Sequence, residues 1–182
     1  MEHEHFQNIE KIDINIREDI MEIFNTYDPS PFMEKDLDDD AADYIISSYK
    51  ELKYKDKVRL VIHIPISQKQ KITEDEIRFA IHNFFSYKAH VTRITLRSKF
   101  LEARDSMIIA ILFLSICLIL KNFLLISNNP FFNIIAEGLT IISWVAMWKP
   151  VSLFLYDWRP IAKDLKIYEK LANSEIIIKY KA

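Results

Sequence analysis

Two long apolar segments in the second half of the chain constrain its fold more than any other feature of the sequence. Residues 107–126 contain one charged side chain, Lys121, and residues 131–148 also contain one, Glu137. Twenty helical residues span about 30 Å, the thickness of the hydrocarbon core of a bilayer. Helices in the core of a soluble protein are usually shorter. The sequence therefore predicts two transmembrane helices, at about 107–126 and 131–150, with a buried hairpin in a soluble protein as the alternative.

The charges around these segments predict their orientation. The connection between them, residues 127–130, is uncharged, and no positively charged apolar stretch opens the chain, so we expect no signal peptide. Basic residues flank the outer ends of the pair: Lys88, Arg93, Arg97, Lys99 and Arg104 before it, and Lys149, Arg159, Lys163 and Lys166 after it. By the positive-inside rule, we expect a multi-pass protein of the cytoplasmic (inner) membrane with both termini in the cytoplasm.

Three short segments alternate apolar and polar residues, which is the period of a half-buried strand. They are residues 11–17, 57–64 and 175–180. Because two strands alone are only marginally stable, we expect all three to form one sheet. Residues 39–53 have a helical apolar stripe after an acidic start, so a right-handed β-α-β unit is expected from the first two strands. Residues 27–32, with two prolines, are predicted to form a turn.

A long helix is predicted to begin after Thr73, where Thr73 and Glu76 have the spacing of a capping box. Apolar residues then recur every three or four positions, and neither Gly nor Pro follows until Pro130. The helix can therefore continue to the end of the first apolar segment, a length of about 80 Å. Only the β-branched residues within 91–97 weaken this prediction. After the second apolar segment, Pro160 fits the first turn of an amphipathic helix.

Charge is segregated along the chain, although the net charge is only −2. Residues 1–56 hold sixteen acids and six bases, residues 57–106 five acids and ten bases, and residues 149–182 four acids and seven bases. The basic parts adjoin the apolar segments, as expected next to an anionic inner leaflet. We expect the acidic part to lie away from lipid or to fold back onto the basic stem. The small net charge predicts no nucleic-acid partner.

The scarcity of glycine and cysteine excludes several classes of function. With one glycine, the chain contains neither a dinucleotide-binding nor a phosphate-binding glycine loop. One cysteine, Cys117, excludes an internal disulfide and a zinc site built on several cysteines, and is expected to face lipid or a helix partner. No Ser or Cys lies in a recognisable nucleophile motif. We therefore predict no catalytic residue, no cofactor and no enzymatic activity.

Neither the acidic run nor the histidines form the pattern of a metal site. Residues 36–43 lack the glycine of an EF-hand calcium loop, and an acidic helix start explains them. His82 and His90 are eight residues apart, too far along one helix to share a metal, and His63 lies on a separate element. We predict no metal site and expect these histidines to be hydrogen-bonded or to face solvent.

Lys121 and Glu137 are the most informative polar residues, because ionisable side chains are unfavourable within a membrane span and usually have a partner. Each is eight residues from Asn129, so an antiparallel hairpin places them at a similar depth. We predict an ion pair or hydrogen bond between them, within one hairpin or between protomers. Alternatively, Lys121 snorkels to the interface and Glu137 is protonated, or the two serve ion conduction. Gly138 is a weak sign of close helix approach.

Aromatic residues gather near the inner end of the second apolar segment. Trp148 precedes the string Tyr156, Asp157, Trp158 and Arg159, and amphipathic rings favour the membrane interface. We interpret these five residues as an interfacial anchor that turns the chain into the last helix, with Asp157 available to cap it. A docking surface for a partner is the alternative interpretation.

Two segments carry a resemblance to a known family: YDPSPFMEKDLDDDAADYI (27–45) and WVAMWKPVSLFLYDWRPI (144–161). The chain resembles a family of uncharacterised prokaryotic two-span integral-membrane proteins. Its members share a Pro-Ser-Pro-Phe turn, an acidic helix start and a Leu-Tyr-Asp-Trp-x-Pro motif after the second span. The resemblance implies a prokaryotic membrane protein of this architecture, and no established activity comes with it. Arg159 stands where Trp is common in the family.

The predicted fold is α+β: a small three-stranded cytoplasmic α/β domain joined by a long helix to a two-helix transmembrane hairpin. The predicted parts are the domain with its helical stem (1–105), the hairpin (106–156), and a C-terminal helix and strand that return to the domain (157–182). We expect an oligomeric membrane-anchored interaction or scaffold protein. Its expected partners are membrane lipids, further copies of itself, and a protein bound by the acidic N-terminal region. The alternative is a small oligomeric channel or transport accessory subunit that uses the two charged residues of the spans, and an enzyme with a membrane-embedded site has the least support.

Overall fold

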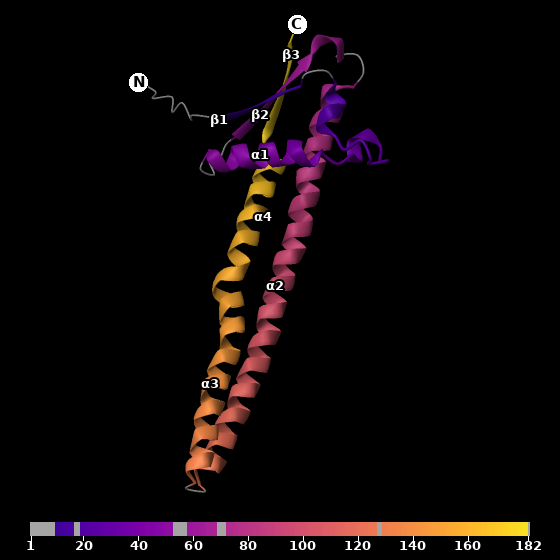
Figure 1. The fold of residues 1–182 in the computed structure, drawn as a ribbon. Coiled ribbons are helices and arrows are strands. Elements are labelled where there is room, and N and C mark those ends of the chain that lie inside the picture. Colours follow the sequence, from indigo (N-terminus) through magenta and orange to yellow (C-terminus); the bar gives the residue numbers. More distant parts are fainter. Residues whose placement is uncertain (1–9, 17–18, 53–57, 69–71, 127–128, 182) are drawn as a thin grey trace, which may run out of the picture. The chain divides into compact units, whose positions relative to one another are not determined.

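The structure is a computed structural model that describes residues 10–16, 19–52, 58–68, 72–126 and 129–181. Contacts within the chain divide it into two compact units, whose elements are shown in Figure 1. We call Met1–Val91 with Asp164–Ala182 the sheet domain, and Thr92–Lys163 the hairpin unit. Residues 92–105 of the predicted stem thus group with the hairpin helices.

The sheet domain contains the three predicted strands in one parallel sheet. They are β1 (Glu10–Asn15), β2 (Val58–Pro65) and β3 (Glu175–Lys181). Their order is β1-β2-β3, so strands from the two ends of the chain flank the strand between them. The predictions of three strands and of a single sheet are confirmed.

The helix α2 (Glu74–Leu125) is one helix of 52 residues that contributes to both units. Thr73 and Glu76 form the predicted capping box: the Glu76 carboxylate accepts the Thr73 N–H at 2.9 Å, and the Glu76 N–H donates to Thr73 Oγ1 at 3.3 Å. The bonds from the Thr73 N–H and hydroxyl lower the pKa of Glu76. The helix continues through 91–97, because no Gly or Pro interrupts it and β-branched residues each cost only tenths of a kcal/mol.

The helix α1 (Asp39–Glu51) follows β1 through two short 3₁₀ turns, η1 (Ile20–Ile23) and η2 (Phe32–Glu34). Asp38 caps α1, since its carboxylate accepts the Asp40 N–H at 3.0 Å. The acidic start therefore has the structural role that the sequence predicted for it.

A continuous helical stretch runs from the second apolar segment to the last strand. Its parts are α3 (Pro130–Ser152), the π-helical stretch η4 (Leu153–Asp157) and α4 (Trp158–Ala172). The predicted turn at this point is wrong, because the helix continues through a π-helical widening instead of ending. Asp157 consequently caps no helix end, while Pro160 lies in the first turn of α4 as predicted.

One face of the sheet is apolar and forms the core of the sheet domain. Ile62 aligns with Ile14 on one side and with Ile178 on the other, and all three side chains are buried. The helix α1, the first turns of α2 and the last turns of α4 pack against this face. Their fully buried side chains include Ile45, Tyr49, Ile77, Ile81, Phe85, Ile167 and Leu171.

The opposite face of the sheet carries polar side chains in cross-strand pairs. Arg59 donates to Glu175 Oε2 at 2.7 and 2.9 Å, and His63 Nε2 lies 2.8 Å from Asp13 Oδ1. Solvent-exposed ion pairs contribute only about 0.2–1 kcal/mol each. The apolar face therefore supplies most of the stability of the sheet.

The loop before α1 is organised by one carboxylate, Asp28. This carboxylate accepts the Asp36 N–H at 2.7 Å and the Ser30 N–H at 2.9 Å, while Lys35 donates to the Asp28 carbonyl at 2.9 Å. The bond from Asp36, followed by that from Ser30, lowers the pKa of Asp28 from 3.8 to about 2. Because the folded pKa is depressed, the ionised carboxylate stabilises the loop above the unfolded pKa, and this stability is lost as the pH falls through the folded pKa.

The Asp28 side chain should therefore titrate unusually low. In a ¹³C NMR titration of the full chain in detergent, we expect the Asp28 carboxyl carbon to have a midpoint near a pH of about 2. In Asp28→Asn, the side chain can accept only one of the two N–H bonds, so at least one of the Ser30 and Asp36 amides should exchange several-fold faster at neutral pH. A midpoint near the ordinary value of 3.8, with unchanged amide exchange in the variant, would contradict this account.

Candidate functional site

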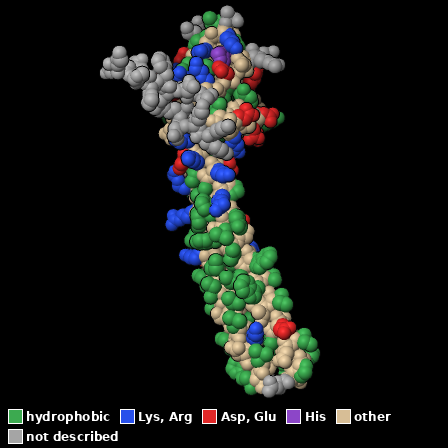
Figure 2. Space-filling view, turned by 90° about the vertical axis from the view of Figure 1, so that its left-hand side faces the viewer, with side chains coloured by type: hydrophobic (Ala, Val, Ile, Leu, Met, Phe, Trp, Pro, Cys, Tyr) green, Lys and Arg blue, Asp and Glu red, His purple; other side chains and the backbone are tan. Residues whose placement is uncertain are grey.

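The hairpin unit contains both apolar segments as helices. Asn129 caps α3, since its side-chain oxygen accepts the Phe131 N–H at 3.0 Å, and Pro130 occupies the first helical position. Both helices are long and apolar enough to cross a membrane, judged by length and composition. Only 11% of the most apolar window of each is buried, unlike the core helix of a soluble protein. Figure 2 shows hydrophobic side chains over most of the visible face of the hairpin helices.

The helices α2 and α3 pack together through small side chains, which we call the small-residue seam. Its buried members are Ala103, Ala110 and Cys117 on α2, and Ala136, Ser143 and Pro150 on α3. Within each helix these positions are seven residues apart, the repeat of a left-handed coiled coil. Small side chains let two backbones approach closely, as helices in lipid require. The seam was not predicted, although its seven-residue spacing is visible in the sequence.

The position of the seam tests the predicted environments of two residues, Cys117 and Gly138. Cys117 is buried in it, so it faces a helix partner, one of its two predicted environments. Gly138, in contrast, lies off the seam: a Cβ added there would meet no described atom within 4 Å. Within this chain Gly138 marks no close helix approach. The seam residue Ser143 is fully buried, and its hydroxyl donates to the Thr140 carbonyl at 2.7 Å.

Lys121 and Glu137 do not contact each other in the described hairpin. Lys121 is half-buried and Glu137 is exposed, and in this part of the chain neither an ion pair nor a hydrogen bond joins their side chains. The prediction of a pair within one hairpin therefore finds no support here. A pair between protomers, and the snorkelling of Lys121, stay predictions.

The predicted interfacial anchor has an exposed aromatic part. Trp148 and Tyr156 are 73% and 60% exposed. The Arg159 guanidinium lies 5.7 Å from the centre of the Tyr156 ring, a cation–π contact that orients both side chains. Asp157 accepts a hydrogen bond from the Ser152 hydroxyl at 3.3 Å. These exposed, amphipathic groups are compatible with a role at a membrane surface, which stays a prediction.

Trp158 has a different environment from the other members of this group. Its indole N–H donates to the Phe154 carbonyl at 3.0 Å, and its ring centre lies 5.8 Å from that of Phe100 on α2. Trp158 therefore links α2 to α4 within the hairpin unit. This packing role could not be read from the sequence, because it depends on the pairing of two distant segments.

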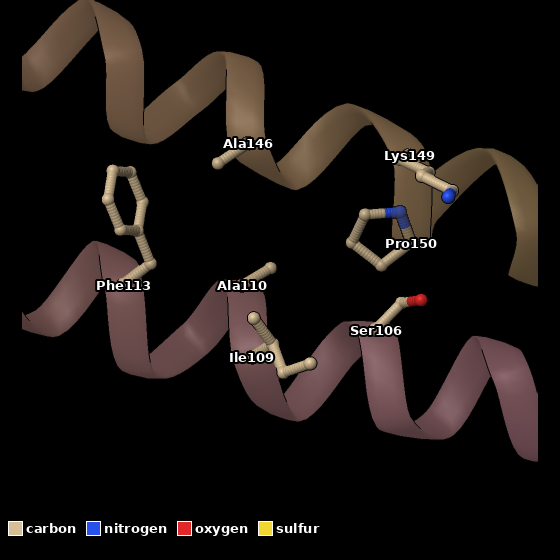
Figure 3. Close-up of a pocket in the computed structure, with 7 residues that line it drawn as sticks. All are labelled: Ser106, Ile109, Ala110, Phe113, Ala146, Lys149 and Pro150. Carbon is tan, nitrogen blue, oxygen red and sulfur yellow. The ribbon is translucent and has the colours of Figure 1, made fainter.

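A groove lies between α2 and α3 towards the end of the hairpin unit opposite the connection at residues 127–130. It has a volume of about 330 Å³. In Figure 3, Phe113 lies at one end, the methyl groups of Ala110 and Ala146 lie along the middle, and Ser106 and Pro150 face each other at the other end. The remaining lining residues are Ile109 and Lys149. The groove is thus apolar with one polar end.

Basic side chains are frequent in the part of the hairpin unit that lies opposite the connection between the two helices. Lys99 donates to Glu102 at 2.8 Å, which raises the pKa of Lys99 and lowers that of Glu102. Arg104 pairs with Asp105 at 2.8 Å. Lys149 contributes a smaller lowering of the Glu102 pKa, and forms no ion pair with a described carboxylate. Lys149 is therefore a cation available to a ligand.

The three described histidines lie in the sheet domain and are hydrogen-bonded or exposed, as predicted. His63 pairs with Asp13, His82 Nδ1 lies 2.6 Å from the Ala172 carbonyl oxygen, and His90 is exposed. Among the residues whose placement is described, no group of three or more His, Cys, Asp or Glu side chains could hold a metal ion.

No protein-family model, curated protein or solved structure matches the chain. The resemblance to a prokaryotic two-span membrane family is therefore carried only by the two segments that suggested it, and stays a prediction. The fold defines a coarser class: a mostly helical chain with a three-stranded parallel sheet and two helices able to span a membrane.

Proposed function

We propose that the chain is an integral membrane protein whose hairpin unit anchors the sheet domain at the cytoplasmic face of the cytoplasmic (inner) membrane. The observation that carries this proposal is the exposed apolar surface of the hairpin helices. Large exposed side chains on them include Ile109, Leu112, Ile116, Ile134, Ile141 and Trp144. Soluble monomers rarely expose continuous apolar patches beyond a few hundred Å². Lipid hydrocarbon is the medium that favours such a surface.

The distribution of charge supports the proposed orientation. Figure 2 shows Lys and Arg side chains towards the end of the hairpin helices opposite their connection. In the sequence, Lys99, Arg104 and Lys149 adjoin the outer ends of the two apolar segments, whereas the connecting residues 127–130 have no charge. Each basic residue near an anionic leaflet contributes about 1 kcal/mol of attraction. The positive-inside rule then leaves both termini in the cytoplasm.

Extraction and labelling test the membrane proposal. The chain should stay in the membrane pellet after alkaline carbonate washing. In a Cys117→Ala background, Asn129→Cys in the connection should react with an impermeant maleimide added to intact cells. Tyr27→Cys, at a site whose native side chain is 94% exposed, should react only after the cells are opened. Release by carbonate, or labelling of residue 27 from outside, would contradict the proposal.

The sheet domain would then serve as an interaction module, and the whole protein as an oligomeric membrane-anchored scaffold. Support comes from exposed carboxylates on and before a firmly capped helix, at Asp36, Asp39, Asp40 and Asp43. A folded helix holds these charges in a fixed pattern that a basic partner surface can match.

Photocrosslinking in cells tests the interaction role. A photoreactive residue at Asp39 should crosslink a protein partner. The same residue at Phe79, which is 52% exposed on another helix, is the matched control and should not. Recovery of no partner from Asp39, or equal recovery from both positions, would count against the role.

A small oligomeric channel or transport accessory subunit is the second candidate, favoured by Lys121 and Glu137. Both lie in apolar helices without an ion pair between them in the described hairpin, and Glu137 is exposed. Charged groups in a span are unfavourable unless they meet a partner or water. Two helices cannot line a pore, so this function needs several protomers. A monomeric mass of the detergent-solubilised protein by light scattering would exclude it.

A further inference from the structure

The groove of Figure 3 is apolar along most of its length. The seam residue Ala110 and its neighbour across the groove, Ala146, present only methyl groups to it, and Phe113 lies at one end. From Phe113 to Ser106 the groove extends along two turns of α2, about 10 Å. Ile109, which also lines it, is 68% exposed. The groove is therefore accessible from the surface that faces lipid in the proposed location.

The polar end of the groove has unused hydrogen-bonding capacity. Within the described chain, the Ser106 hydroxyl makes no hydrogen bond. The hydroxyls of Ser115 and Ser143, in the same two helices, each donate to a carbonyl of their own helix. Lys149, which forms no ion pair with a described carboxylate, lines the same end of the groove from the opposite helix. A hydroxyl and an ammonium group together can bind a phosphate.

The charge around this end favours an anion. Residues 92–106 and 149–163 together hold seven bases and three acids. Two of the three acids, Glu102 and Asp105, are already paired with Lys99 and Arg104. A free phosphate would be bound only by its attraction to these basic residues. A ligand that also has a hydrocarbon chain would gain from the apolar groove as well, by about 0.8 kcal/mol per buried methylene group.

We propose that the groove binds one anionic glycerophospholipid, with the headgroup phosphate at Lys149 and Ser106 and an acyl chain along Ala110, Ala146 and Phe113. This inference rests on the proposed membrane function of the hairpin unit. Its consequence is a preference for lipid class: the protein binds phosphatidylglycerol more tightly than phosphatidylcholine with the same acyl chains. The bound lipid fills the space that the small side chains leave between the two helices.

Native mass spectrometry of the full chain, released from detergent with added lipid, measures this preference. The wild-type protein should bind a first phosphatidylglycerol roughly five- to tenfold more tightly than phosphatidylcholine. Lys149→Gln should remove most of that difference, because it weakens the binding of the anionic phosphatidylglycerol more than that of the zwitterionic phosphatidylcholine. Ala146→Phe should fill the groove and weaken the binding of both lipids.

Lys163→Gln is the matched control, because Lys163 is an exposed basic residue of the hairpin unit that does not line the groove. It should leave the preference intact. Equal binding of the two lipids by the wild-type protein, or an equal loss in Lys149→Gln and Lys163→Gln, would overturn the proposal. If Ala146→Phe does not fold, the two lysine variants still decide it. Carbonate extraction tests the membrane proposal separately, so a failure of lipid selectivity alone would leave that proposal standing.

Discussion

Phe85→Ala is expected to destabilise the sheet domain by about 3–5 kcal/mol, because it removes a large side chain from a close-packed core. Phe85 is fully buried, and its ring packs edge to face on Phe84 with ring centres 5.2 Å apart. It belongs to the cluster that joins α1, α2 and α4 to the sheet. Since single domains are stable by only about 5–15 kcal/mol, a loss of this size is a large fraction of the total.

Hydrogen exchange resolved by peptide measures this loss where it occurs. Amides of β2, the central strand, should exchange roughly two to four orders of magnitude faster in Phe85→Ala, since each 1.4 kcal/mol is a factor of ten. Phe79→Ala is the matched control on the same helix, because Phe79 is 52% exposed. It should change exchange less than about threefold, as expected for a surface substitution. Similar effects of both variants would show that the described core is wrong.

The elements of the sheet domain could be predicted because their signals are local. Ile12 and Ile14 of β1 alternate with polar residues, and the same period marks β2 and β3. Thr73 and Glu76 mark a helix start by side chains that bond to nearby backbone. The turn η1 has the same kind of signal, a capping box of Asp19 and Glu22, but it was missed because so short an element shows no periodicity.

The features that could not be predicted depend on whether a helix continues past a proline, or on contacts between residues that are far apart in the chain. The π-helical stretch η4 lets one helix pass from apolar to amphipathic sequence, whereas Pro150 and Pro160 in the sequence suggest an interruption there. The contact of Trp158 with Phe100 joins residues that are far apart in the chain. For Lys121 and Glu137, the sequence predicts a shared depth in the hairpin, but their spacing does not show on which sides of the two helices they lie.

The small-residue seam leads to the second large effect, which concerns the hairpin unit. Ser143→Leu is expected to destabilise the packing of α2 against α3 by about 1–3 kcal/mol, because Ser143 is fully buried and a larger side chain must displace its neighbours. Ser143→Ala should have a much smaller effect, since the native hydroxyl bonds only within its own helix, to Thr140. All three tryptophans of the chain lie in the hairpin unit, so Trp fluorescence during denaturation by SDS reports this unit alone.

Gly138→Leu makes the test specific, because it adds the same side chain to the same helix at a position with open space around its Cβ. The fluorescence midpoint should fall in Ser143→Leu, whereas Gly138→Leu should leave it unchanged or raise it, since Gly is a poor helix former. If Gly138→Leu lowers the mass of the solubilised complex without moving the midpoint, Gly138 lies at a contact between protomers. Equal midpoints in the two leucine variants would mean that the seam does not hold the helices together. Comparison of the two leucine variants therefore distinguishes helix packing within one hairpin from association between hairpins.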